Sequence, residues 1–159
     1  MGASIVRQAL AFTAARTFYL MQTFLPYPDF KKSASVLDWR RLGNQRNECN
    51  QLLKALTEGG GWRYHPAALM WEGYEPALRR YRNTIIQEWV SRGYRNSIPL
   101  LRSGGRVRMP PWLGCPEFHA AHRSNLLRKN PEFYSQWGWD EPDDLPYVWP
   151  VLNEERKAG

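Results

Sequence analysis

The stretch PALRRYRNTIIQEWVSRGY, residues 76–94, decides the fold that we expect. Its apolar side chains recur at helical spacing, at Leu78, Tyr81, Ile85 and Trp89. A period of three to four residues places them on one face of an α-helix and leaves the arginines largely on the other. Pro76 suits the first turn of a helix, and Gly93 suits the position just beyond its end. The stretch therefore predicts an amphipathic helix packed on a core.

A second helix is expected upstream. Asp29 and Ser33 are alternative N-caps for it, because either side chain can accept a hydrogen bond from a backbone N–H of the first turn. The glycines of EGGG, residues 58–61, should end this helix, and Gly43 is a point where it could bend. The two prolines of TFLPYPDF, residues 23–30, keep the chain before it extended. The prediction is an extended lead into one long helix.

Turn-rich links separate the remaining helical segments. A short helix is expected after His65 and Pro66, a longer one from Pro116, and a restart after Pro131. Residues 95–116 between them read as a basic loop rich in Gly and Pro. No alternation of apolar and polar residues persists long enough to build a sheet. The predicted fold class is all-α, a compact single domain with irregular Pro/Gly-rich loops.

The charge of the chain indicates its partner. It carries 22 Lys plus Arg against 15 Asp plus Glu, a formal net charge of +7, which favours a polyanion. Much of the excess is arginine interleaved with Trp, Tyr and His; guanidinium groups bind phosphates and aromatic rings stack on bases, so nucleic acid is favoured over a membrane surface. Cys49 and Cys115 lack CxxC spacing, which favours a reducing cytoplasm.

Residues 1–20 differ in composition from the rest of the chain. They are poor in acid, and Arg7 and Arg16 interrupt their apolar runs, so we expect no membrane span. A transit peptide, an upstream start codon and an extra helix are the alternatives for this segment. We expect an N-terminal extension over 1–20, a helical domain over 21–150 and a polar tail over 151–159. Whether the working protein begins at Met21 decides whether a chain terminus can take part in its chemistry.

Three stretches in order carry a resemblance. LDWRRLGNQRNE (37–48), GWRYHPAALMWEGYEPALRRYRNTIIQEWVSRGYRN (61–96) and HRSNLLRKNPEFYSQWG (122–138) together resemble the pyrimidine-dimer DNA glycosylases of the phage endonuclease V type. The resemblance runs from about Met21 to Trp139. It implies an all-helical enzyme that needs no metal or organic cofactor. We expect a monomer whose partner is double-stranded DNA with a pyrimidine lesion.

The resemblance also implies a mechanism. Such enzymes attack C1′ of the sugar at a cis-syn thymine dimer with the amine of the N-terminal residue, and a Schiff base then permits strand nicking by β-elimination. A terminal amine titrates near pH 8, so much of it is a neutral nucleophile. A glutamate completes the site, and its best match in this chain is Glu48.

The nucleophile is harder to assign from the sequence. Thr23 would offer a terminal amine only after trimming of the chain, and otherwise it is a residue at the start of the core. A lysine amine is the alternative, although an ordinary lysine is mostly protonated near neutrality. The lysines considered are Lys31, Lys32 and Lys54. Glu48 itself could instead lie on a solvated helix face.

The resemblance assigns DNA contacts as well. Arg41 and Arg46 lie on turns near Glu48, and His65 either lies near the damaged DNA or fixes the helix after it. Arg123, Arg128 and Lys129 match a basic helix beside the DNA backbone.

The two remaining histidines, His119 and His122, lie on the same predicted helix. We expect His122 to contact phosphate together with Arg123. His119 stands one turn before His122, a spacing known from metal sites, but no third ligand is well placed, so we predict no metal. Two rival functions stay open: a noncatalytic DNA-binding protein, and a glycosylase for another modified phage base.

Overall fold

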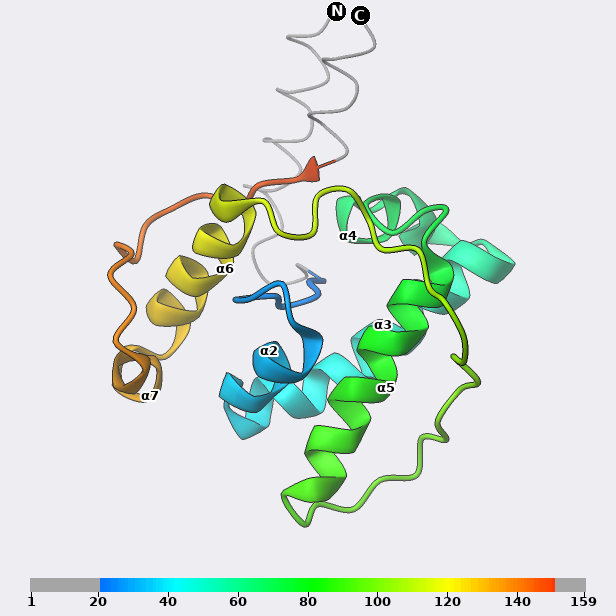
Figure 1. Cartoon of the computed structure of the whole chain (residues 1–159), viewed down its shortest axis with the longest axis horizontal. Helices are drawn as coiled ribbons and strands as arrows, with labels where there is room; N and C mark the ends of the chain where they lie inside the picture. The colour runs from blue at the N-terminus through cyan, green and yellow to red at the C-terminus, as the bar shows by residue number, and fades with distance from the viewer. Residues whose placement is uncertain (1–20, 151–159) are drawn as a thin grey trace, which may run out of the picture.

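The computed structural model of the chain describes residues 21–150 (Figure 1). The predicted extension over 1–20 and the tail over 151–159 lie outside the described residues. The α-helices are α2 Phe30–Val36, α3 Trp39–Glu58, α4 Pro66–Leu69, α5 Glu75–Ser91, α6 Pro116–Lys129 and α7 Pro131–Tyr134, with 3₁₀ turns η2 Gly61–Tyr64 and η3 Ser135–Trp137. Since residues 21–150 contain helices and no strand, the all-α prediction is confirmed.

The long helix predicted upstream is two helices. Asp29 caps α2, where its Oδ1 accepts from the N–H of Lys32 at 2.6 Å. Leu37 and Asp38 then adopt extended backbone, and α3 starts anew. Asp38 is held outside a helix because its N–H donates to the hydroxyl of Tyr134 at 3.0 Å and its carboxylate accepts from the same hydroxyl. The chain therefore turns at Asp38.

Gly43, where the sequence allowed a bend, lies inside the continuous helix α3. Its role is close packing. A Cβ at this position would lie 3.0 Å from the ring of Trp89 on α5. The missing side chain thus lets α3 and α5 approach each other closely at this point.

Replacing Asp29 with alanine should lower the free energy of unfolding by about 1 kcal/mol, because α2 loses the side chain that satisfies its first-turn N–H. Urea unfolding followed by tryptophan fluorescence measures the loss. Ser35→Ala is the control, since the Ser35 hydroxyl bonds only the carbonyl of Lys32 and caps no free N–H. Equal stability of the two variants would contradict the capping role.

The core forms where α3 and α5 pack together. The predicted apolar face of α5 is buried at Leu78, Tyr81 and Ile85. Trp71 is fully buried between Tyr81 and Trp112, with ring centroids 6.1 and 5.0 Å away. This core supports the extended segment that enters the domain.

That segment, residues 21–25, runs buried between α6 on one side and α3 and α5 on the other (Figure 1). Leu25 N–H bonds His122 on α6, and Phe24 N–H bonds Gln45 on α3. The carbonyl of Phe24 accepts from the hydroxyl of Tyr81 on α5 at 2.6 Å. Three helices thus fix the start of the described chain, and the candidate site lies beside it.

Candidate active site

Glu48 lies on α3 next to the segment 21–25. Its Oε2 accepts from the side-chain N–H of Gln45 at 3.0 Å and from the backbone N–H of Gln22 at 3.4 Å. Burial raises the pKa of Glu48 to about 7, and the hydrogen bond from Gln22, the charge of Lys129 and the hydrogen bond from Gln45 limit the rise. A carboxyl that titrates near neutrality can both give and take a proton at working pH.

Gln45 joins Glu48 to the entering segment. It is fully buried, and its side-chain N–H groups donate to Glu48 and to the carbonyl of Gln22, the latter at 2.6 Å. Its Oε1 accepts from the N–H of Phe24 at 3.1 Å and lies 2.9 Å from the hydroxyl of Tyr81. The sequence offered one signal for this role, which is the position of Gln45 one helical turn before Glu48.

Thr23 is a core residue in this structure. It is fully buried, its N–H donates to Oε1 of Gln22 at 3.0 Å, and its hydroxyl accepts from the indole N–H of Trp71 at 3.1 Å. Its nitrogen is part of a peptide bond, so a Thr23 amine would require cleavage after Gln22. The backbone nitrogen that contacts Glu48 is that of Gln22.

Arg41 and Arg46, two of the three arginines of α3, have different partners. Arg41 forms an ion pair with Asp38 at 3.1 Å, and its charge acts on Lys129 and on Tyr147. The charges of Arg41 and Glu48 both act on Tyr147, so both side chains lie near this tyrosine. Arg46 lies over the ring of Trp89 at 4.2 Å and donates to Asn96 at 2.8 Å. It holds the chain after α5 in place.

His65 has the helix-fixing role that the sequence left open. It is buried, and its Nδ1 accepts from the N–H of Ala67 at 3.0 Å, which caps α4. Its ring lies 5.5 Å from that of Trp62 and 6.1 Å from that of Trp149. Desolvation lowers the pKa of His65, so the ring is neutral near pH 7. A contact with damaged DNA stays a prediction.

His122 does not reach a phosphate in this structure. It is fully buried, and its Nδ1 accepts from the N–H of Leu25 at 2.9 Å. Nδ1 of His119 lies 2.8 Å from the carbonyl of Leu25, while its Nε2 accepts from the N–H of Gly114 at 2.9 Å. The expected phosphate contact of His122 has no support in this conformation, because the two histidines bind the N–H and the carbonyl of Leu25 in the core.

No metal cluster forms among residues 21–150: no three His, Cys, Asp or Glu side chains are grouped so that they could hold an ion. In the pair on α6, both ring nitrogens of His119 and Nδ1 of His122 bind backbone groups instead. Nor is any helix in this part of the chain both long and apolar enough to cross a membrane.

The basic residues of α6 have different partners. Arg128 donates to the side chain of Asn125 and to the carbonyl of Asp143. Arg123 pairs with Glu141 at 2.6 Å and donates to the carbonyl of Pro26 at 2.7 Å, so it fastens two loops to the helix. Arg128 and Lys129 are exposed. Desolvation, then the charges of Arg41 and Arg128, lower the pKa of Lys129, whereas Glu48 raises it. Lys129 interacts with Glu48, and Arg41 and Arg128 interact with Lys129; we call these three cations the cationic rim of the site.

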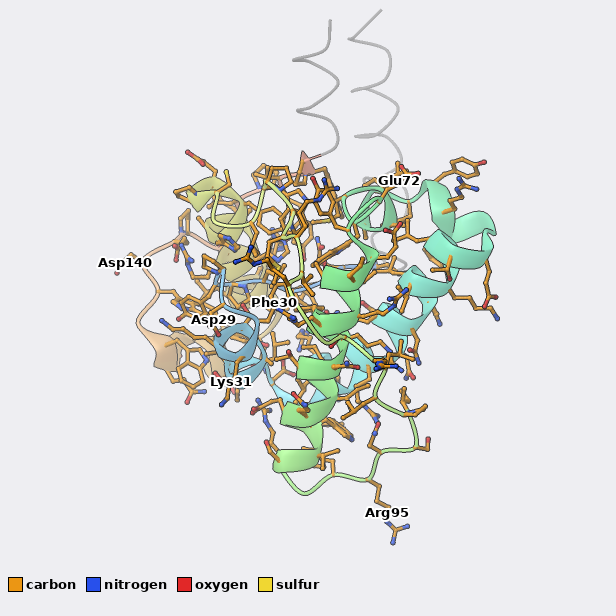
Figure 2. The ribbon with its side chains drawn as sticks, turned by 45° about the vertical axis from the view of Figure 1, so that its right-hand side comes forward. Asp29, Phe30, Lys31, Glu72, Arg95 and Asp140 are labelled. Carbon is orange, nitrogen blue, oxygen red and sulfur yellow. The ribbon has the colours of Figure 1, made fainter. Side chains whose placement is uncertain are left out.

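Lys129→Ala should flatten the salt dependence of duplex binding. One phosphate contact contributes about 0.9 to the slope of log K against log salt, and Lys129 is an exposed cation of the rim. Fluorescence anisotropy between low and moderate salt measures this slope. The control is Arg95→Ala, which removes the same charge from a side chain that points away from the fold beyond α5 (Figure 2). Parallel slopes for wild type and Lys129→Ala would remove Lys129 from the DNA contacts.

Comparisons with known proteins point the same way as the site. A family model described as pyrimidine dimer DNA glycosylase matches residues 21–101, half of the chain. The match begins with the segment that contacts Glu48 and includes α3, α4 and α5. No curated protein and no solved structure matches the chain.

Proposed function

Because the chain belongs to the family of pyrimidine dimer DNA glycosylases, a family of DNA repair enzymes, we propose that it removes a damaged pyrimidine, such as one in a cis-syn thymine dimer, and then nicks the strand as an AP lyase. One observation carries the catalytic part of this proposal. It is the Glu48 carboxyl, whose pKa of about 7 suits proton transfer and which lies against the entering segment at Gln22.

In the proposed reaction a neutral primary amine attacks C1′ of the sugar. The bond from C1′ to the pyrimidine nitrogen breaks, and the base leaves with the first amine proton. The C1′–O4′ bond of the sugar then opens, O4′ takes the second amine proton, and the nitrogen forms the C=N bond of an imine with C1′. A base then removes a proton from C2′, and the 3′ phosphate leaves by β-elimination. Glu48 is suited to give a proton to a leaving group and to take the proton from C2′. A carboxyl with a pKa of about 7 is populated in both forms near neutral pH.

We propose that the amine is a chain end freed within residues 21–23. The nitrogen of Gln22 already lies 3.4 Å from the Glu48 carboxylate, and Thr23 is the next residue. A terminal amine is substantially neutral near pH 8, which a lysine usually is not. Lys129 is the lysine whose charge acts on Glu48, so it is the side-chain amine to compare.

The rim supplies the binding part of the proposal. Lys129 interacts with the carboxyl, Arg41 and Arg128 interact with Lys129, and the chain as a whole has a net charge of +7. Such a rim would hold the phosphates on both sides of a lesion, which positions the sugar over Glu48. Arg46 and Arg123 are bound to protein groups and would support this surface indirectly. Two cations of the rim have protein partners as well, Asp38 for Arg41 and Asn125 for Arg128.

Borohydride trapping tests the proposed reaction. Versions that begin at Met1 and at Met21 are incubated with a dimer-containing duplex, a matched undamaged duplex and a duplex with an abasic site, and any adduct is mapped by mass spectrometry. We expect a covalent adduct at a terminal residue within 21–23, formed with the dimer and abasic duplexes only.

Other outcomes separate the rival functions. An adduct at Lys129 would keep the imine but replace its amine. An adduct with the abasic duplex alone would indicate a glycosylase for another modified base. Tight duplex binding without any adduct would leave a noncatalytic DNA-binding protein and overturn the proposal.

A further inference from the structure

The orientation of the Gln45 side chain is determined by backbone groups. Its nitrogen lies 2.6 Å from the carbonyl of Gln22, which can only accept a hydrogen bond. Its oxygen lies 3.1 Å from the N–H of Phe24, which can only donate. Turning the amide over would place two donors together and two acceptors together. The amide therefore has one orientation, and it is fully buried there.

This orientation directs the second N–H of Gln45 at Oε2 of Glu48, 3.0 Å away. The N–H of Gln22 points at the same oxygen from 3.4 Å. Both donors are permanent, so a proton on Oε2 would be opposed by two N–H groups. Oε1 of Glu48 receives no hydrogen bond within residues 21–150, and it is not among the fully buried atoms that lack a partner. When Glu48 is protonated, the proton therefore resides on Oε1.

We propose that Gln45 is the positioning residue of the proposed glycosylase reaction, because it holds Oε2 of Glu48 as a permanent acceptor and so confines proton exchange to Oε1, the accessible oxygen. This inference rests on the proposed function for its catalytic meaning. It assigns one carboxyl oxygen to the chemistry and the other to the protein. The Gln45 amide binds both the entering segment and Glu48, so a shift of the segment would move the amide and turn the carboxyl.

Hydrogen bonding from Gln45 favours the ionised carboxyl and lowers the pKa of Glu48, against the larger effect of burial. Other titratable groups also share electrostatic interactions with Glu48. They are Cys49 on α3, Tyr81 on α5, Lys129 on α6 and Tyr147 in the segment after α7. All of them stay unchanged in the test, so a displaced titration reports on the amide.

The test compares Gln45→Met and Gln45→Glu with wild type. Methionine keeps the approximate size without the N–H donors, and glutamate keeps the shape but replaces the donor by a second carboxyl. Both should raise the pKa of Glu48 by about one unit or more, because a hydrogen bond to a charged group is lost. Two readouts are used: the pH dependence of single-turnover cleavage, and the titration of the Glu48 carboxyl by ¹³C NMR without DNA.

Gln51→Met is the matched control, because Gln51 is an exposed glutamine on the same helix. Its titration and pH profile should equal those of wild type. Circular dichroism identifies variants that remain folded, and Gln45→Glu serves where Gln45→Met does not. An upward shift in both readouts supports the proposal.

A folded Gln45 variant that loses rate without any shift in either readout would overturn the positioning role. The NMR titration keeps this result separate from the proposed function. A shifted titration in a protein whose wild type cleaves nothing would keep the link between Gln45 and Glu48 but reject the reaction. If the wild type cleaves the duplex but the Glu48 titration is unshifted in the variants, the reaction stands and the link between Gln45 and Glu48 is rejected.

Discussion

Glu48→Gln should reduce cleavage of a dimer-containing duplex by about 10²–10⁴-fold and leave duplex binding nearly unchanged. Glutamine keeps the shape of the side chain, and its carbonyl can accept the two N–H groups that now bond Oε2. What it loses is the proton that a carboxyl with a pKa of about 7 exchanges. Single-turnover nicking assays and anisotropy titrations measure the two quantities separately.

Glu58→Gln is the control for this result, since Glu58 is an exposed glutamate at the end of α3. It should cleave at the wild-type rate. Full activity in Glu48→Gln would remove Glu48 from the mechanism. Equal loss of binding and cleavage would instead assign Glu48 to the shape of the DNA-binding surface.

The raised pKa of Glu48 also makes the stability of the folded protein depend on pH. The folded pKa of Glu48 is about 7, above the ordinary value of 4.5, so the folded protein binds more protons than the unfolded chain between these values. Stability contributed by Glu48 therefore falls as the pH rises through this window, by at most about 3 kcal/mol. An ionised buried carboxylate is unfavourable for the fold, which is consistent with its retention for chemistry.

Local signals in the sequence predicted the helices well, and long-range contacts account for the misses. Pro116 and Pro131 begin helices as predicted, and Asp29 caps α2. The break after α2 was missed because it depends on Tyr134, which lies far along the chain from Asp38. The packing role of Gly43 was missed because it depends on Trp89 of another helix.

The site shows the same division. Glu48 was identified through the resemblance to a family. Of the two donors that orient it, Gln45 lies one helical turn away in the sequence, whereas Gln22 is distant in the sequence and no spacing rule reveals its hydrogen bond. The sequence shows which residues are charged, but it does not show which group each charged side chain binds. Arg123 reads like a free phosphate ligand, but Glu141 binds it.

His122 should make the protein sensitive to acid. Its buried ring has a pKa of about 3, lowered first by desolvation and then by the charges of His119 and Arg123, whereas the ordinary value is 6.5. The unfolded chain therefore binds more protons between pH 3 and 6.5, and stability falls as the pH drops through this window. The loss from His122 alone should approach about 4 to 5 kcal/mol at the acid end.

His122→Asn isolates this effect, because the asparagine oxygen can accept from the N–H of Leu25 but does not titrate. The variant should be less stable than wild type at pH 7.5, since a smaller side chain leaves space beside Phe24 and Phe118. Its free energy of unfolding should nevertheless fall less steeply between pH 6.5 and 4. Urea unfolding at a series of pH values gives both curves.

Leu126→Ala distinguishes titration from general weakening. Leu126 is fully buried on the same helix, and its truncation lowers stability without removing a titrating group. Its curve should run parallel to that of wild type, whereas the curve of His122→Asn should converge on it in acid. The carboxyl groups are the same in all three proteins, so their titration cancels when the free energies of unfolding are subtracted. If His122→Asn also ran parallel to wild type, the ring of His122 would have to accept its proton inside the folded core, and the neutral, backbone-binding role assigned to it would be wrong.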